Sequence, residues 1–104
     1  MVMDREVLRA KLNLDTARIG WNELQRHFAA GQLVAVRGGL DLVEAALGLS
    51  TDDKASVSEW IATNRIGKVS DEEALAWHAA QATLWAVVVK PWVLVQEEGT
   101  ASLQ

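Results

Sequence analysis

Apolar residues recur at helical spacing in five parts of the chain, and short polar or glycine-containing segments separate these parts. Apolar positions three and four residues apart form one side of a helix, which is buried against the rest of the protein. The clearest start signal is Ser70-Asp71-Glu72-Glu73, a capping box in which Ser70 caps the helix and the Glu73 side chain reaches back to the Ser70 amide. The pattern predicts helices over residues 4–14, 21–30, 40–49, 54–63 and 71–81.

The residues at the ends of these helices give further predictions. Ser50 or Thr51 is expected to cap the fourth helix, because a hydroxyl oxygen can accept a hydrogen bond from an amide of the first turn. Gly31 is expected to end the second helix, since glycine adopts the left-handed conformation without steric cost. On the fifth helix we expect Leu75 and Trp77 to face the core.

Two segments 33 residues apart, FAAGQLVAV and IATNRIGKV, follow the same local pattern. Each has a helix end, a Gly or Asn stop and an extended segment. The agreement indicates either an internal duplication, or two unrelated helices that each end at a Gly or Asn for the same conformational reason.

The most apolar stretch, LWAVVVKPWVLVQEE over residues 84–98, has a Lys90-Pro91 pair in its middle. Proline cannot take the positive φ of the favoured two-residue hairpin turns. The chain therefore either reverses through a less common turn, with a cis or a trans Lys90-Pro91 bond, or continues through a kink. We predict strands at 83–89 and 92–97, in a small sheet with a strand at 33–36. Residues 65–69 are expected to form a short strand or an extended connector.

Both sides of this run are apolar, so both must be covered. Taken as one alternating strand, the run places Leu84, Ala86, Val88, Trp92 and Leu94 on one side, and Trp85, Val87, Val89, Val93 and Val95 on the other. We expect the helices to pack on one face of the sheet and a homodimer to bury the second face, because a large exposed apolar patch usually marks a contact surface. The alternative is that the helix over residues 4–14 covers the second face.

The predicted fold class is α+β: a single small domain in which four or five helices pack on a small mixed or antiparallel sheet. A chain of 104 residues has enough apolar residues for one core. The domain is expected to span residues 1–98. The last segment, 99–104, is expected to be a disordered tail.

Composition and charge argue against several classes of function. The chain has 14 Asp and Glu against 10 Lys and Arg, and no basic stripe that could neutralise phosphates, so we expect no nucleic-acid partner. The absence of cysteine excludes disulfides and thiolate sites. The apolar run is shorter than the ~20 residues that a membrane helix needs. The first residues also lack the apolar segment of a secretory signal, so we expect a cytoplasmic protein without a membrane partner.

Five tryptophans are the most distinctive feature of the composition. Rings that stack bases normally lie in a basic groove, so packing in a core or an interface is the preferred interpretation. Trp92 is the best candidate for an exposed ring that makes a contact. The predicted interaction surface includes Trp92, Val93 and Trp85.

A pocket between helices and sheet is the alternative site. Trp60, Trp77 or Trp85 would form its walls, and His78 or Arg37 its edge. Arg37 precedes two glycines whose backbone amides could cradle an anion, but a tight turn is the preferred role of this segment.

The sequence predicts no catalytic residue, metal site or cofactor. His27 and His78 lie in no ligand spacing such as HExxH. The acidic residues at 52–53 and 71–73 lie at helix starts, where the helix dipole accounts for them without a catalytic role.

Four segments, IGWNELQRHFAAGQLVAV, LDLVEAALGL, SDEEALAW and LWAVVVKPWVLVQE, together resemble a family of short uncharacterised bacterial proteins, a domain of unknown function. The resemblance covers residues 14–97. It implies a bacterial, single-domain, cytoplasmic protein and brings no activity, cofactor or catalytic residue. The function is therefore unknown, and the leading hypothesis is a non-enzymatic protein-interaction or regulatory module that self-associates. The alternative is a small-molecule-binding protein or minor enzyme with a Trp-lined pocket.

Overall fold

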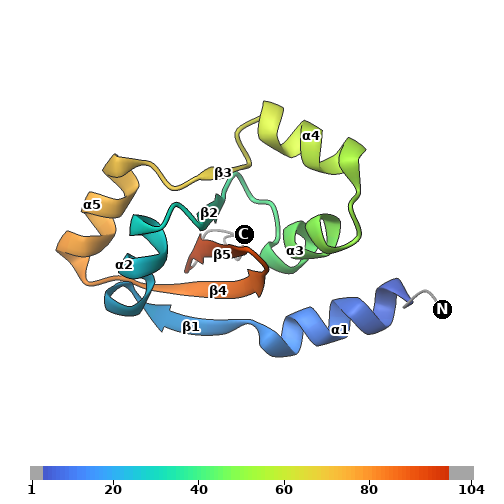
Figure 1. The fold of residues 1–104 in the computed structure, drawn as a ribbon, viewed down its shortest axis with the longest axis horizontal. Coiled ribbons are helices and arrows are strands. Elements are labelled where there is room, and N and C mark those ends of the chain that lie inside the picture. The colour runs from blue at the N-terminus through green and yellow to red at the C-terminus, as the bar shows by residue number, and fades with distance from the viewer. Residues whose placement is uncertain (1–3, 99–104) are drawn as a thin grey trace.

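A five-stranded mixed sheet lies at the centre of the computed structural model, which describes residues 4–98 (Figure 1). The tail expected at 99–104 lies outside the described residues. The strands are β1 (Ala17–Gly20), β2 (Leu33–Val36), β3 (Ile66–Lys68), β4 (Thr83–Val89) and β5 (Trp92–Glu97). The helices are α1 (Arg5–Asp15), α2 (Trp21–Ala29), α3 (Leu42–Ser50), α4 (Lys54–Ala62) and α5 (Asp71–Ala80). The fold is α+β, as the sequence predicts.

The strand order is β1-β4-β5-β2-β3. β5 and β2 run parallel, and the other three neighbouring pairs run antiparallel. The sheet is therefore mixed, and β1 and β3 form its two edges.

Helices cover both faces of the sheet, so the expected uncovered face is wrong. One core cluster joins the sheet to α2 and α5 through residues such as Leu24 and Trp77. The other joins it to α1 and α3 through Leu12 and Leu47, with α4 packed beside α3. Figure 1 shows α2 and α5 together at one side of the molecule and α1, α3 and α4 at the other. The alternative, that the first helix covers the second face, is correct in part, because α1 shares that face with α3.

β4 and β5 occupy the two ranges that the apolar run predicts, and they form a hairpin around a cis Lys90-Pro91 bond. Opposed residues in a hairpin share a face of the sheet. Val89 pairs with Trp92, and Val88 with Val93. Trp92 therefore lies on the face of Val89, and its expected grouping with the Leu84 side is wrong because the chain reverses.

Helix starts follow the predicted chemistry with one exception. The Ser70 capping box is present, with Ser70 Oγ 3.0 Å from the Glu73 amide and Glu73 Oε1 2.9 Å from the Ser70 amide. At α4 the cap is Asp53, and neither Ser50 nor Thr51 takes that role. Ser50 is the last residue of α3, and the Thr51 hydroxyl donates instead to Leu47 O at 2.8 Å.

Two segments depart from the predicted pattern. The sequence does not predict β1, whose four residues connect α1 directly to α2. Leu75 is 69% exposed although it is expected to face the core. Ala74 and Trp77 are the buried residues of α5, so the buried side of this helix is rotated away from Leu75.

The two segments related by 33 residues share their local structure. α2 leads to β2 through Gly31 at φ 75°, and α4 leads to β3 through Asn64 at φ 60°. Both stops are left-handed, as the residue types predict. None of the helices within residues 4–98 has the length and apolar character needed to cross a membrane.

Candidate functional site

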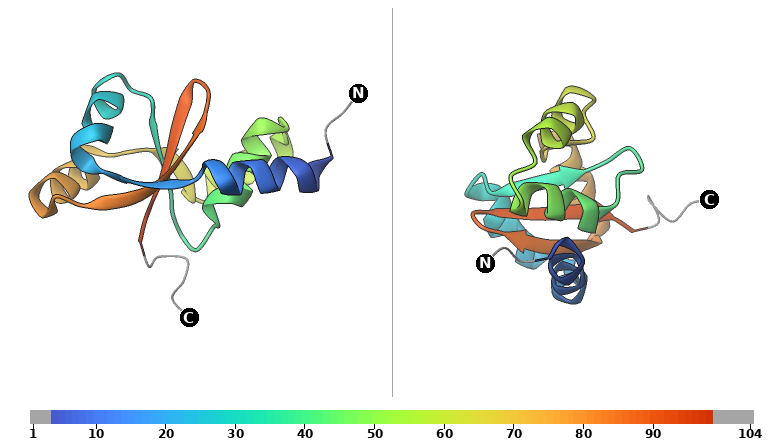
Figure 2. Two further views of the ribbon diagram at one scale, coloured as in Figure 1. Left: turned by 90° about the horizontal axis from the view of Figure 1, so that it is seen from below. Right: turned by 90° about the vertical axis from the view of Figure 1, so that its right-hand side faces the viewer.

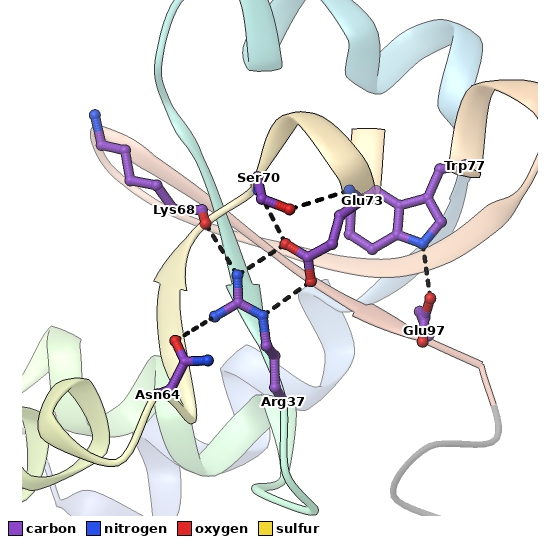
Figure 3. Close-up of polar contacts among 7 residues, drawn as sticks. All are labelled: Arg37, Asn64, Lys68, Ser70, Glu73, Trp77 and Glu97. Carbon is purple, nitrogen blue, oxygen red and sulfur yellow. Dashed lines mark hydrogen bonds and ion pairs between the residues drawn. The ribbon is translucent and has the colours of Figure 1, made fainter. Parts of the chain in front are cut away.

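Arg37, directly after β2, is the centre of the main polar cluster (Figure 3). Its Nε and Nη2 donate to the two carboxylate oxygens of Glu73 at 2.9 and 2.8 Å. Nη2 also donates to the Lys68 carbonyl at 3.0 Å, and Nη1 to Asn64 Oδ1 at 3.2 Å. The guanidinium therefore joins β2 and β3 to the first turn of α5.

This ion pair shifts the titration of both partners. The hydrogen bond from Arg37 holds the pKa of Glu73 below its ordinary value, against the opposing effect of burial, and the Ser70 amide adds to the lowering. The hydrogen bond to Glu73 likewise raises the pKa of Arg37. Arg37 is thus committed to a partner within the chain and is not free to bind an anion.

The two glycines after Arg37 form a tight turn. Gly38 and Gly39 have φ angles of 65° and 81°, which favour glycine, and the Leu40 amide donates to Arg37 O at 3.3 Å. A Cβ on Gly38 would also lie 2.9 Å from Arg65 Cγ. The segment after Arg37 is therefore a tight turn, which is the role preferred for it from the sequence.

A hollow of about 220 Å³ lies beside the cluster, at the carboxyl ends of the parallel strands β2 and β5. Arg37, Glu73 and Trp77 line one part of it, and Gln96 and Glu97 another. Trp77 Nε1 donates to Glu97 Oε2 at 2.8 Å (Figure 3). Gln96 Nε2 donates to the Leu40 carbonyl at 2.6 Å. Each of these polar side chains already bonds within the chain.

Of the residues predicted to form a pocket, only Arg37 and Trp77 line this hollow. Trp60 packs on α3 instead, where a Cβ on Gly48 would lie 2.7 Å from its Cζ3. His78 is exposed on α5. The structure therefore brings together two of the five residues named for the pocket.

A second cavity of about 220 Å³, which we call the Trp92 groove, lies between α4 and the β3 side of the sheet. The apolar side chains that line it are Val34, Leu49, Val57, Ile61, Ile66 and Trp92. None of the α4 residues is buried, and Ile61 is 59% exposed. Since α4 does not close onto the strands, the groove stays open to solvent.

Lys68 adds a charge to the rim of the Trp92 groove. Its Nζ lies 5.5 Å from the Trp92 ring centroid, within the range of a cation–π contact. No carboxylate of residues 4–98 lies within ion-pair distance of this ammonium. The groove thus combines apolar walls with a positive charge that the described part of the chain does not neutralise.

The residues predicted for the interaction surface lie apart. Trp92 is half-buried in the groove, whereas Val93 is buried on the opposite face against the α2 side. Trp85 is 38% exposed and pairs with Gln96, away from the hairpin turn. Ile61 and Lys68 were not predicted as site residues, because their role depends on the distance between α4 and the sheet.

Within residues 4–98, no group of three or more His, Asp or Glu side chains could hold a metal ion. His27 Nδ1 lies 3.5 Å from Gln32 Oε1, and His78 is exposed. The two histidines lie on different helices, α2 and α5.

These features define a small α+β domain in which helices cover both faces of a mixed sheet, with an open apolar groove at one side. The chain belongs to the family described as Protein of unknown function (DUF2288), whose model matches residues 7–97. It is also similar to the NMR solution structure of PA1075 from Pseudomonas aeruginosa, with 44% identity, a TM-score of 0.77, and coverage of 94% of this chain and 91% of that one. A comparison with curated proteins finds no match. The family brings no known activity.

Proposed function

We propose that this chain is a non-enzymatic protein-interaction module of the bacterial cytoplasm, and that it binds an apolar side chain of a partner protein in the Trp92 groove. The observation that carries the proposal is the groove itself, whose apolar walls stay open between α4 and the sheet. The polar cluster at Arg37 supports binding less well, because its groups are already paired within the chain.

The charge of Lys68 indicates what kind of partner segment the groove accepts. An apolar side chain in the groove would contribute about 1.5–3 kcal/mol through burial. A carboxylate beside it would meet the Lys68 ammonium at the rim, close to Trp92. The expected ligand is therefore a large apolar residue next to Asp or Glu in a partner protein.

Similarity to a Pseudomonas aeruginosa protein supports the bacterial part of the proposal. The proposed function also includes self-association of the chain. The contact between two copies would differ from the one expected from the sequence, because helices of the same chain cover both faces of the sheet.

A selection of random peptides displayed on phage tests the groove, with the purified chain as bait. The enriched peptides should carry an apolar residue beside Asp or Glu, and Ile61→Asp should weaken their binding at least about tenfold, in line with the loss of apolar burial. Leu75→Asp is the matched control, because Leu75 is a similarly exposed apolar residue on a different helix. Lys68→Glu should remove the preference for acidic peptides.

Two results would overturn the groove as the site. The first is a selection that enriches no peptide above an uncoated surface. The second is a set of peptides that bind the Ile61→Asp and wild-type proteins equally. Thermal unfolding of the Ile61→Asp and Leu75→Asp proteins checks that neither change acts through loss of the fold.

One observation favours a second candidate function, the binding of a small molecule. The hollow beside Arg37 and Trp77 lies at the carboxyl ends of the two parallel strands, where ligands of open α/β sheets commonly bind. A metabolite that occupies it should change Trp77 fluorescence and raise the melting temperature. Absence of both effects across a metabolite library would leave the groove as the site to study.

A further inference from the structure

β1 presents an open edge of the sheet. The Trp21 amide donates to Ala82 O at 2.8 Å, and the register pairs Ala17 with Ala86 and Ile19 with Leu84. Since backbone groups alternate along an antiparallel strand, Ala17 and Ile19 point toward β4. The N–H groups of Arg18 and Gly20 point outward, to the side on which β1 has no neighbouring strand within residues 4–98. Gly20 is the N-cap of α2, so its carbonyl already accepts the first hydrogen bond of that helix. In the left view of Figure 2, β1 crosses the front of the molecule with no element over it.

At the opposite edge of the sheet, a side chain covers one outward carbonyl. Arg37 N donates to Arg65 O, and Val69 N to Leu33 O, so the backbone groups of Lys68 face away from β2. The outward carbonyl of Lys68 accepts the hydrogen bond from Arg37 Nη2. Charged side chains placed across an edge prevent pairing with another strand. β3 has an outward carbonyl covered in this way, whereas no side chain of residues 4–98 is seen to bond the outward backbone of β1.

We infer that β1 is the contact of a symmetric homodimer, in which it pairs antiparallel with β1 of a second copy around a two-fold axis beside Ile19. This register places Arg18 opposite Gly20 of the second copy, so each outward residue meets an outward residue. Each such pair can form two N–H···O bonds, in which the Gly20 carbonyl accepts from the Arg18 N–H through its second lone pair. Gly20 remains extended at φ −75° and ψ 152°, as this pairing requires.

The neighbouring registers are less favourable. An axis beside Arg18 would place the two guanidinium groups directly opposite each other, and like charges in that position destabilise a strand pair. An axis beside Gly20 would oppose Arg18 to a residue of α2 in the second copy. In the proposed register Arg18 meets a glycine and keeps its ion pair with Glu98.

An exposed leucine supports a contact along this edge. Leu14, in the last turn of α1 just before β1, is 83% exposed, more than any other large apolar side chain of residues 4–98. The proposal goes beyond the Trp92 groove, because β1 and the groove lie at opposite edges of the sheet. A dimer through β1 leaves the groove free in both copies.

Sedimentation velocity over a range of concentrations, with a matched pair of variants, tests the contact. Wild-type protein and Arg18→Ala should form the dimer, because the alanine keeps the outward N–H. Arg18→Pro should shift the dimerisation constant at least about tenfold toward monomer. Proline removes one outward donor and leaves the bonds to β4 intact, since proline is tolerated on an edge whose N–H faces solvent.

Hydrogen exchange on the wild-type protein gives a second test that needs no variant. The Arg18 and Gly20 amides should exchange more slowly as the concentration rises, whereas Ile19 should be protected at every concentration. A monomer at all concentrations, a dimer that Arg18→Pro leaves unchanged, or unprotected Arg18 and Gly20 amides in the dimer would each overturn the inference. None of these results bears on peptide binding at Ile61.

Discussion

Arg37 and Glu73, separated by 36 positions in the sequence, form a two-bond ion pair that fixes the first turn of α5 to the end of β2. The side chains of both residues are about three-quarters buried, at 23% and 27% exposure. The same Glu73 carboxylate also completes the capping box of α5. One side chain therefore contributes both to a helix start and to a contact between sheet and helix.

Glu73→Gln should reduce the free energy of unfolding by about 1 kcal/mol at pH 7, because it replaces a charged pair with a neutral amide. The pKa of Glu73 is lowered in the folded protein. Its contribution is therefore present above the unfolded-state pKa and is lost as the pH falls through the folded-state value. Urea unfolding of both proteins should show a difference at pH 7 that shrinks as the solution becomes acidic.

Glu72→Gln is the control for this prediction, since Glu72 is a neighbouring exposed carboxylate of the same helix turn. It should change stability much less. An undiminished difference between wild type and Glu73→Gln in acid, where the carboxylate is protonated, would contradict the role given to the ion pair.

Gly67→Ala should disturb Arg37 from the opposite side. A Cβ at this position would lie 3.2 Å from Arg37 Nη1, so the guanidinium would have to move from its place over β3. The substitution should cost about 0.5–1 kcal/mol, although alanine is otherwise better than glycine in a strand. The double variant with Glu73→Gln should be less destabilised than the sum of the two changes, which a double-mutant cycle measures. Strict additivity would show that Gly67 acts independently of the cluster.

Gly48→Ala should move α4 away from α3. The added Cβ would lie 2.7 Å from Cζ3 and 2.9 Å from Cη2 of Trp60, and a rigid ring cannot relieve this contact by rotating one bond. Overpacking of this kind costs about 1–3 kcal/mol, partly offset by the better helix propensity of alanine. Thermal unfolding measures the loss, and Trp60→Leu in the same chain should restore part of it. An unchanged melting temperature for Gly48→Ala would contradict the close contact.

The same substitution, Trp→Phe, can be compared at Trp21 and at Trp77 for its effect on stability. The two rings pack together with centroids 5.8 Å apart, and both are buried. Trp77 Nε1 donates to Glu97, whereas Trp21 Nε1 is buried and has no hydrogen-bond partner within residues 4–98. Trp77→Phe should therefore cost about 1 kcal/mol more than Trp21→Phe, since only the first removes a formed bond. Urea unfolding measures the free energy of unfolding of both variants. A larger loss for Trp21→Phe than for Trp77→Phe would contradict the role given to the Trp77–Glu97 hydrogen bond.

Local chemistry along the chain was sufficient to predict most of the elements. The Ser70 capping box, the stop at Gly31 and the two strands around Lys90-Pro91 all depend on residues close in sequence, and each is confirmed. β1 was missed because its four residues, ARIG, are too few to show a period of two.

The placement of helices on the sheet was predicted less well, because it depends on contacts between distant segments. The apolar residues of the hairpin show that both faces are covered, and they do not identify which helices cover them. The Trp92 groove has the same origin. It arises because α4 packs on α3 through Trp60 and leaves its own residues unburied, which no pattern within α4 indicates.

The position of Arg37 across β3 also determines how far such sheets could grow. A second copy that pairs at β1 presents its own β3 at the far end, where its own guanidinium covers the outward carbonyl. The joined sheet would then end at two β3 strands whose Lys68 carbonyls are covered, which disfavours growth beyond two copies. Substitutions that free Lys68 O from Arg37 should therefore make it easier for further copies to add at β3.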